Sequence, residues 1–98
     1  MRRTAVGGLS AALPRIRYEL SAHAATVIAE REIDIAWIER VLAEPERSGP
    51  DRTDPSLVHA LGPIAEKGNR VLRVVYNPAM EPLRVVTAYF DRRQRGDK

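Results

Sequence analysis

The sequence predicts an α+β domain made of a short N-terminal strand, two helices and then a three-stranded antiparallel meander. Three observations lead to this prediction. Polar and apolar residues alternate over 15–20, apolar residues recur at helical spacing in two segments between 21 and 45, and three segments after 57 are rich in Val, Leu and aromatic residues. Because the predicted helices and the predicted meander occupy separate parts of the chain, we expect helices to cover one face of an antiparallel sheet.

Length and composition predict one domain with a single core. The chain has 98 residues, 44% of them apolar, and no cysteine, which excludes disulfides and thiolate metal sites. We expect a flexible tail over 1–14, the domain over 15–92 and a basic tail over 93–98. No apolar run approaches the roughly 20 residues of a membrane span, and a cytoplasmic location without membrane contact is expected.

The positive charge of the chain is concentrated at its two ends. The formal net charge is +3, but residues 18–91 hold 8 basic and 12 acidic residues. The basic ends can bind phosphates through Coulomb attraction and counterion release. We therefore expect Arg17, Arg92 and Arg93 to contribute to any contact with RNA.

The segment from Ser21 to Pro45 predicts two short helices. Ser21 suits the N-cap of the first helix, because its hydroxyl can accept a hydrogen bond from a free amide of the first turn. His23 falls at the border of that helix's apolar stripe. Asp34 suits the N-cap of the second helix, and Pro45 ends it because proline lacks an amide proton.

Residues 44–56 contain three prolines, a glycine and many polar side chains, and they predict a loop at the rim of a groove. Strands are predicted over 57–64, 69–77 and 83–91. The predicted register places Arg73 opposite Thr87 and Val71 opposite Tyr89, with a loop from 78 to 82. One face of the last two strands then carries Leu72, Val74, Tyr76, Val86, Ala88 and Phe90, and the other carries Val71, Arg73, Val75, Val85, Thr87 and Tyr89.

The order of these segments resembles a family of small bacterial domains of unknown function. The shared pattern is a first helix containing His23, the Arg-x-Ile step at Arg31, a second helix ending Val-Leu-x-x-Pro, and a last strand with Val-Thr-Ala. It covers the chain from 17 to about 92. Such families are similar to the RelE and BrnT type toxin ribonucleases.

The resemblance implies a RelE-like or barnase-like arrangement and a metal-independent endoribonuclease without a cofactor. It also implies an antitoxin protein as a partner, because such enzymes are often the toxin of a toxin and antitoxin pair. The positions of this chain that match the family pattern are His23, Arg31, Arg73 and Thr87. Oligomeric state is not implied.

Metal-free RNA cleavage needs proton transfer at the 2′-hydroxyl and the leaving 5′-oxygen, and cations at the phosphate. Histidine is the residue type that changes charge near neutrality, so His23 suits the proton transfer. Arg31 or Arg73 can hold the phosphate with a guanidinium fork. Thr87 or Tyr89 can orient a phosphate oxygen, and Tyr89 can instead stack on a base.

Each of these residues also has a structural interpretation. His23 can be a hydrogen-bonded structural residue, Arg31 can close its helix, and Arg73 can be an exposed cross-strand partner of Thr87. His59 alternates with leucines and is expected to be a packed histidine, unless it lies near His23 and forms an acid and base pair with it. A non-catalytic domain that binds protein or nucleic acid through a sheet edge therefore remains the alternative.

Overall fold

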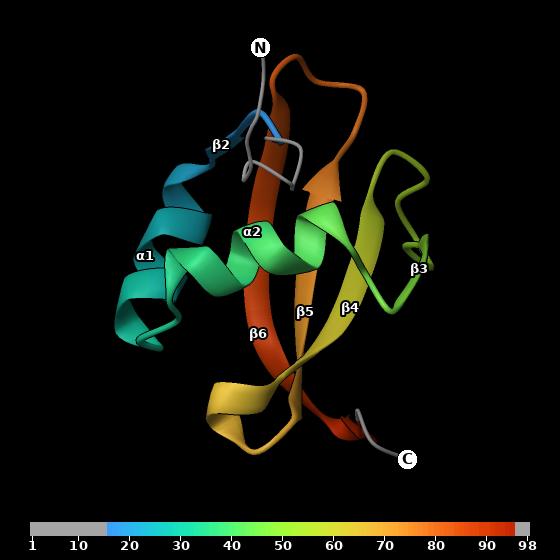
Figure 1. Cartoon of the computed structure of the whole chain (residues 1–98). Coiled ribbons are helices and arrows are strands. Elements are labelled where there is room, and N and C mark those ends of the chain that lie inside the picture. The colour runs from blue at the N-terminus through green and yellow to red at the C-terminus, as the bar shows by residue number, and fades with distance from the viewer. Residues whose placement is uncertain (1–15, 96–98) are drawn as a thin grey trace, which may run out of the picture.

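The structure is a computed structural model that describes residues 16–95, with side chains as far as Arg92, and it has a mixed α+β fold. Helices α1 (Ala22–Glu30) and α2 (Ile35–Ala43) lie on one face of a five-stranded sheet, and a 3-10 turn η1 (Ala65–Lys67) joins two of its strands (Figure 1). The strands, in the order β2-β6-β5-β4-β3 across the sheet, are β2 (Tyr18–Leu20), β6 (Leu83–Arg95), β5 (Arg70–Asn77), β4 (Val58–Ile64) and β3 (Arg47–Pro50).

The predicted domain limits fall as follows. The predicted tail over 1–14 lies outside the described residues. Strand β6 continues through Arg95, beyond the expected limit of the domain at 92. Neither helix of the described part is long and apolar enough to cross a membrane.

Helix α1 begins and ends with local hydrogen bonds that its sequence supplies. The Ser21 hydroxyl accepts from the Ala24 amide at 3.0 Å, as the N-cap prediction requires. At the other end the Ile33 amide donates to the Ile28 carbonyl at 3.0 Å, and Glu32 takes the left-handed conformation with φ 56°. This Schellman closure buries Ile28 and Ile33 together, which turns the chain toward α2.

Helix α2 crosses the middle of the sheet in front of β6, β5 and β4 (Figure 1). The Asp34 carboxylate accepts from the Ala36 amide at 2.9 Å and begins the helix. The last helical residue, Ala43, precedes Pro45 as predicted. The apolar stripe of α2 therefore faces the sheet and forms the core with it.

The core lies between the helices and this face of the sheet. Gly62 of β4 permits a close approach, since a Cβ there would lie 3.3 Å from Val41 Cγ2. The buried members of the core are Ala24, Ile28, Ile33, Ile38, Val41, Ala60, Ile64, Leu72, Val74, Val85 and Ala88.

The register between β5 and β6 differs from the predicted one. Arg73 pairs with Tyr89 rather than Thr87, and Val71 pairs with Asp91 rather than Tyr89. A bulge between Val75 and Tyr76 adds one residue to β6 and reverses the alternation of its side chains there. Consequently Val85, and not Val86, is in the core beneath the helices, so the predicted faces are wrong at these two positions.

The sheet has two short strands at its edges: β2, which lies within the predicted N-terminal strand, and β3, which was not predicted. Strand β3 lies inside the predicted loop and pairs antiparallel with β4. Its sequence, Arg-Ser-Gly-Pro, lacks apolar alternation because the strand is short and mostly exposed at the edge. Strand β2 pairs parallel with β6, but only with residues 83–85. The predicted three-stranded sheet is therefore part of a larger, mixed one.

Candidate functional site

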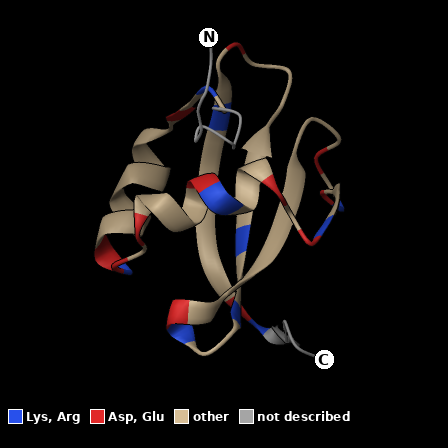
Figure 2. Ribbon diagram, viewed as in Figure 1, with Lys and Arg blue, Asp and Glu red and all other residues tan. Residues whose placement is uncertain are grey.

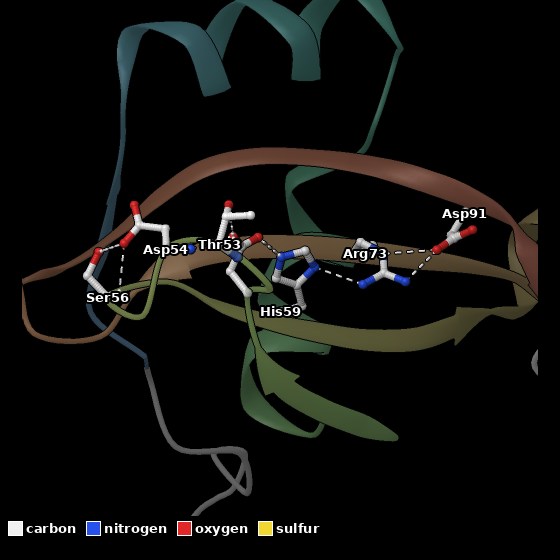
Figure 3. Close-up of polar contacts among 7 residues, drawn as sticks. Thr53, Asp54, Ser56, His59, Arg73 and Asp91 are labelled. Atoms are coloured by element: carbon white, nitrogen blue, oxygen red, sulfur yellow. Dashed lines mark hydrogen bonds and ion pairs between the residues drawn. The ribbon is translucent and has the colours of Figure 1, made fainter.

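Four charged or polar side chains form a row on the sheet face opposite the helices, and we call them the polar row: Asp51, His59, Arg73 and Asp91. His59 Nε2 lies 2.6 Å from Asp51 Oδ1, and His59 Nδ1 lies 2.8 Å from Arg73 Nη1. Arg73 also donates to Asp91 Oδ2 from Nε at 2.9 Å and from Nη2 at 2.5 Å. Figure 3 shows these contacts following one another from the loop after β3 to the far part of β6.

The strand register explains why these side chains meet. Leu61 of β4 is paired with Arg73 of β5, so His59 lies diagonally from Arg73 on the same face. Val71 is paired with Asp91, so Asp91 lies diagonally from Arg73 on the other side. Diagonal neighbours in a sheet are within reach of long side chains, and the row therefore crosses three strands.

Arginine fixes the protonation state of His59 in this arrangement. The guanidinium has only N–H donors, so the short contact requires a lone pair on His59 Nδ1. The ring proton then lies on Nε2 and is donated to Asp51. His59 is thus a neutral imidazole with both nitrogens hydrogen-bonded, and a proton added at Nδ1 would set two donors against each other.

Asp51 ties the loop after β3 to the row. Besides the hydrogen bond from His59, its carboxylate accepts from the amides of Thr53 and Asp54, at 3.1 and 3.0 Å. These donors, with His59 the largest contribution, hold the pKa of the Asp51 carboxyl well below its usual range. Asp51 is therefore ionised throughout the physiological range and orients the imidazole.

The row is partly shielded but open to solvent. The exposed fractions of the side chains are 18% for His59 and Arg73, 22% for Asp51 and 12% for Asp91. With His59 neutral, the row holds two carboxylates and one guanidinium. The formal charge of the row itself is therefore one negative unit.

Three of the predicted site residues lie on this open face. Arg73, Thr87 and Tyr89 share it, because Arg73 pairs with Tyr89 and Val75 pairs with Thr87. Tyr89 therefore stands directly across from Arg73, and Thr87 lies two residues further along β6 on the same face. The predicted grouping of these three residues agrees with the register in the structure, although the predicted partner of Arg73 does not.

The other two predicted site residues lie on the helical side. His23 is exposed on α1. Arg31 donates from Nη1 to the carbonyl of Ala88 at 2.8 Å, where β2 no longer covers the edge of β6. Arg31 thus satisfies a strand carbonyl, and the sheet itself separates His23 and Arg31 from Arg73.

The residues expected to contact RNA lie near the sheet edge. Arg17 is exposed just before β2, and Arg92 is exposed in β6. The side chain of Arg93 lies outside the described residues. Figure 2 shows that most other charges of the described part lie on the helices, turns and strand ends.

Sequence reasoning did not include Asp51, His59 and Asp91 in the site. The sequence did hold a signal for His59. Alternation placed it on one face of its strand, and Arg73 was expected in the neighbouring strand, so a contact between the two could have been considered. Asp91 required the correct register, and Asp51 required knowledge of the path of the loop. Within residues 16–95, the structure contains no group of three or more His, Asp or Glu side chains arranged to hold a metal ion.

Comparison with known proteins identifies the family. Residues 20–90 match the family described as Domain of unknown function (DUF4258). No curated protein and no solved structure matches the chain. The matched range begins at the end of β2 and ends within β6, so it includes both helices, the loop with Asp51 and most of the sheet. The chain is therefore a member of the DUF4258 family.

Proposed function

We propose that this domain is a toxin-like, metal-independent endoribonuclease whose substrate lies across the open face of the sheet. The observation that carries the proposal is the direct contact between His59 and Arg73 on that face, with Tyr89 across from Arg73. A proton-carrying group and a phosphate-binding group are thereby side by side. RNA and an antitoxin protein are the proposed partners.

The two carboxylates of the polar row support this chemistry by orienting the two functional groups. Asp51 holds His59 through Nε2 and turns Nδ1 toward Arg73. Asp91 holds Arg73 through Nε and Nη2. A reacting group fixed by a carboxylate partner loses less freedom when substrate binds, which favours catalysis.

The proposed reaction is an internal transesterification of the RNA backbone. The ribose 2′-oxygen attacks phosphorus, its proton passes to solvent, and the bond from phosphorus to the 5′-oxygen breaks. Arg73 neutralises charge on the phosphate, and His59, after taking up a proton from solvent at Nδ1, donates that proton to the leaving 5′-oxygen. The products are a 2′,3′-cyclic phosphate and a 5′-hydroxyl.

Tyr89 and Thr87 are proposed to orient the substrate. Tyr89 offers a ring for base stacking beside Arg73, and Thr87 offers a hydroxyl to a phosphate oxygen. His23 and Arg31 are on the other side of the sheet, so they are not part of this proposed centre. This distinction makes the two histidines a matched pair for mutation.

The test is incubation of labelled RNA with the protein in EDTA, followed by analysis of the product ends. We expect cyclic phosphate ends from the wild type, a loss on the order of 10²- to 10⁴-fold in His59→Ala, and near wild-type cleavage in His23→Ala. Circular dichroism checks that each variant is folded. Absence of cleavage by the folded wild type, or loss in His23→Ala with His59→Ala unaffected, would contradict the proposal.

The alternative, a binding domain without catalysis, is favoured by one specific observation. Strand β2 covers only residues 83–85 of β6, and no other strand of the described part pairs with the outer side of β6. A partner segment can add to such an edge through main-chain hydrogen bonds. The RNA assay separates the two functions, because a binding domain gives no cyclic phosphate.

A further inference from the structure

We infer that His59 and Arg73 form a binding site for an oxyanion, such as a phosphate group of RNA, which fills only when His59 takes up a proton. This inference deepens the proposed function, and its assignment of RNA as the natural ligand rests on that function. The site itself can be tested without RNA. The coupling of proton and anion follows from the direction of the hydrogen bond between the two side chains.

The hydrogen bond from Arg73 to His59 cannot form when Nδ1 of His59 is protonated. Arg73 Nη1 donates to His59 Nδ1 at 2.8 Å, and this bond needs the Nδ1 lone pair. Protonation of Nδ1 removes the lone pair and places two N–H donors face to face. The His59 ring and the Arg73 Nη1 group must then separate.

An oxygen anion between the two side chains satisfies both donors. The protonated Nδ1 and Arg73 Nη1 each donate to that oxygen, and both hydrogen bonds are charge-assisted. Asp51 still accepts from Nε2, so the ring keeps its orientation in both states. Asp91 still holds Arg73 through Nε and Nη2, so the guanidinium stays on this face of the sheet.

Electrostatics favours the same coupling. The charged and titratable groups that share this face with His59 come from the loop after β3 and from strands β3, β5 and β6; they are Asp51, Arg47, Arg73, Tyr89 and Asp91. With His59 neutral, these groups carry no net formal charge, because Arg47 and Arg73 balance Asp51 and Asp91. The added proton gives this set of groups a net positive charge, so anion and proton favour each other's binding.

The coupling assigns a direction to the proton transfer in the proposed reaction. If the RNA phosphate enters together with a proton, His59 is an imidazolium in the complex. It can then donate the Nδ1 proton to the 5′-oxygen as the bond from phosphorus breaks. His59 is therefore the general acid of the proposed cleavage.

The test uses sulfate, which remains a dianion over the pH range in which histidine titrates. The full chain is titrated with sodium sulfate at several pH values between about 5.5 and 8. Ionic strength is matched with sodium chloride so that general screening stays constant. Nitrogen NMR of the histidine rings reports the protonation of Nδ1 and Nε2 directly.

We expect the wild-type ring to carry its proton on Nε2 without sulfate at the alkaline end, and Nδ1 to become protonated when sulfate binds. One proton per ion predicts an affinity that falls about tenfold for each pH unit above the titration of the ring. His59→Gln should lose this pH dependence, and His23→Gln should keep it. Because Gln is uncharged and polar, His59→Gln also tests the coupling if His59→Ala fails to fold.

Three results would overturn the inference: sulfate affinity independent of pH in the wild type, the same pH dependence in folded His59→Gln, or no sulfate binding at about pH 5.5. Failure of the inference is separable from failure of the proposed function. Cleavage of RNA with pH-independent sulfate binding would overturn only the coupling. Proton-coupled sulfate binding without RNA cleavage would overturn only the ribonuclease proposal.

Discussion

The two faces of the sheet contrast in how they are stabilised. Under the helices, the contacts are apolar and the core includes fully buried Ile38 and Leu72. On the open face, paired charges accompany buried Val71 and Val75. A hydrophobic core tolerates substitutions that keep its volume and apolar character, whereas removal of either partner of a partly buried ion pair destabilises the fold.

Polar contacts on the helical side make the contrast clearer. Arg40 of α2 forms a two-pronged ion pair with Glu66 of η1, and this lowers the pKa of Glu66 to about 2. Both side chains are about half exposed, at 45% and 51%, so water screens the pair. Arg73 and Asp91 are far less exposed, and their mutual dependence should be correspondingly stronger. This difference can be measured.

The largest effect is expected from the helical face. Ile38→Ala should lower the free energy of unfolding by about 2–5 kcal/mol, because it leaves a cavity in the core. Ile35→Ala, one turn earlier on the same helix, is the control: Ile35 is 37% exposed, and we expect a change within about 0.5 kcal/mol. Urea unfolding measures both. Equal losses in the two variants would contradict the core position of Ile38.

The next effect concerns the open face. Arg73→Met should cost about 1–3 kcal/mol, because it removes donors from Asp91 and His59. In a double-mutant cycle with Asp91→Leu, the two costs should be non-additive, with a coupling of about 0.5–3 kcal/mol. Arg84→Met on β6 is the control, since its ion pair with Glu19 is exposed and long at 3.8 Å. Additive costs at Arg73 and Asp91 would show that the row does not stabilise the fold.

The helical face was largely predictable from the sequence. Ser21 and Asp34 accept hydrogen bonds from the first turns as N-caps should, and Pro45 follows the end of α2. These predictions succeed because capping and helical periodicity depend on neighbouring residues alone. The apolar side of the strands was predicted for the same reason, except around the bulge, where Val85 replaces Val86 in the core.

The open face was predictable only in part. Alternation placed Thr87 and Tyr89 on one side of their strand, and the predicted register, which differs from the observed one by two residues, kept Arg73 on that same side. The contacts of Arg73 depend on register over three strands, and an extra residue in β6 changes that register. Asp51 reaches His59 because β3 forms within a segment whose composition indicates only a loop. Local sequence does not specify such long-range pairings, which is why His23 was predicted as a catalytic residue and His59 as a packed one.

The smallest effect we expect is a pH dependence that originates on the open face. The hydrogen bond from His59 and the loop amides lower the pKa of Asp51 in the folded state. A carboxyl with a depressed pKa contributes stability above its unfolded value of about 3.9, and this contribution is lost as the pH falls through that value toward the folded pKa. Asp51→Asn should therefore reduce the loss of stability between about pH 5 and pH 2.

Unfolding by urea at several acidic pH values measures this dependence. Asp54→Asn is the control, because Asp54 lies in the same loop and its side chain accepts hydrogen bonds from Ser56 rather than from the sheet. If Asp51→Asn and the wild type lose stability equally on acidification, the bond between the loop and His59 does not hold in solution. If Asp51→Asn loses less stability than the wild type on acidification and Asp54→Asn does not, the loop is attached to the open face through the charge of the Asp51 carboxylate. On the helical face, the corresponding charged link is the exposed ion pair between Arg40 of α2 and Glu66 of η1.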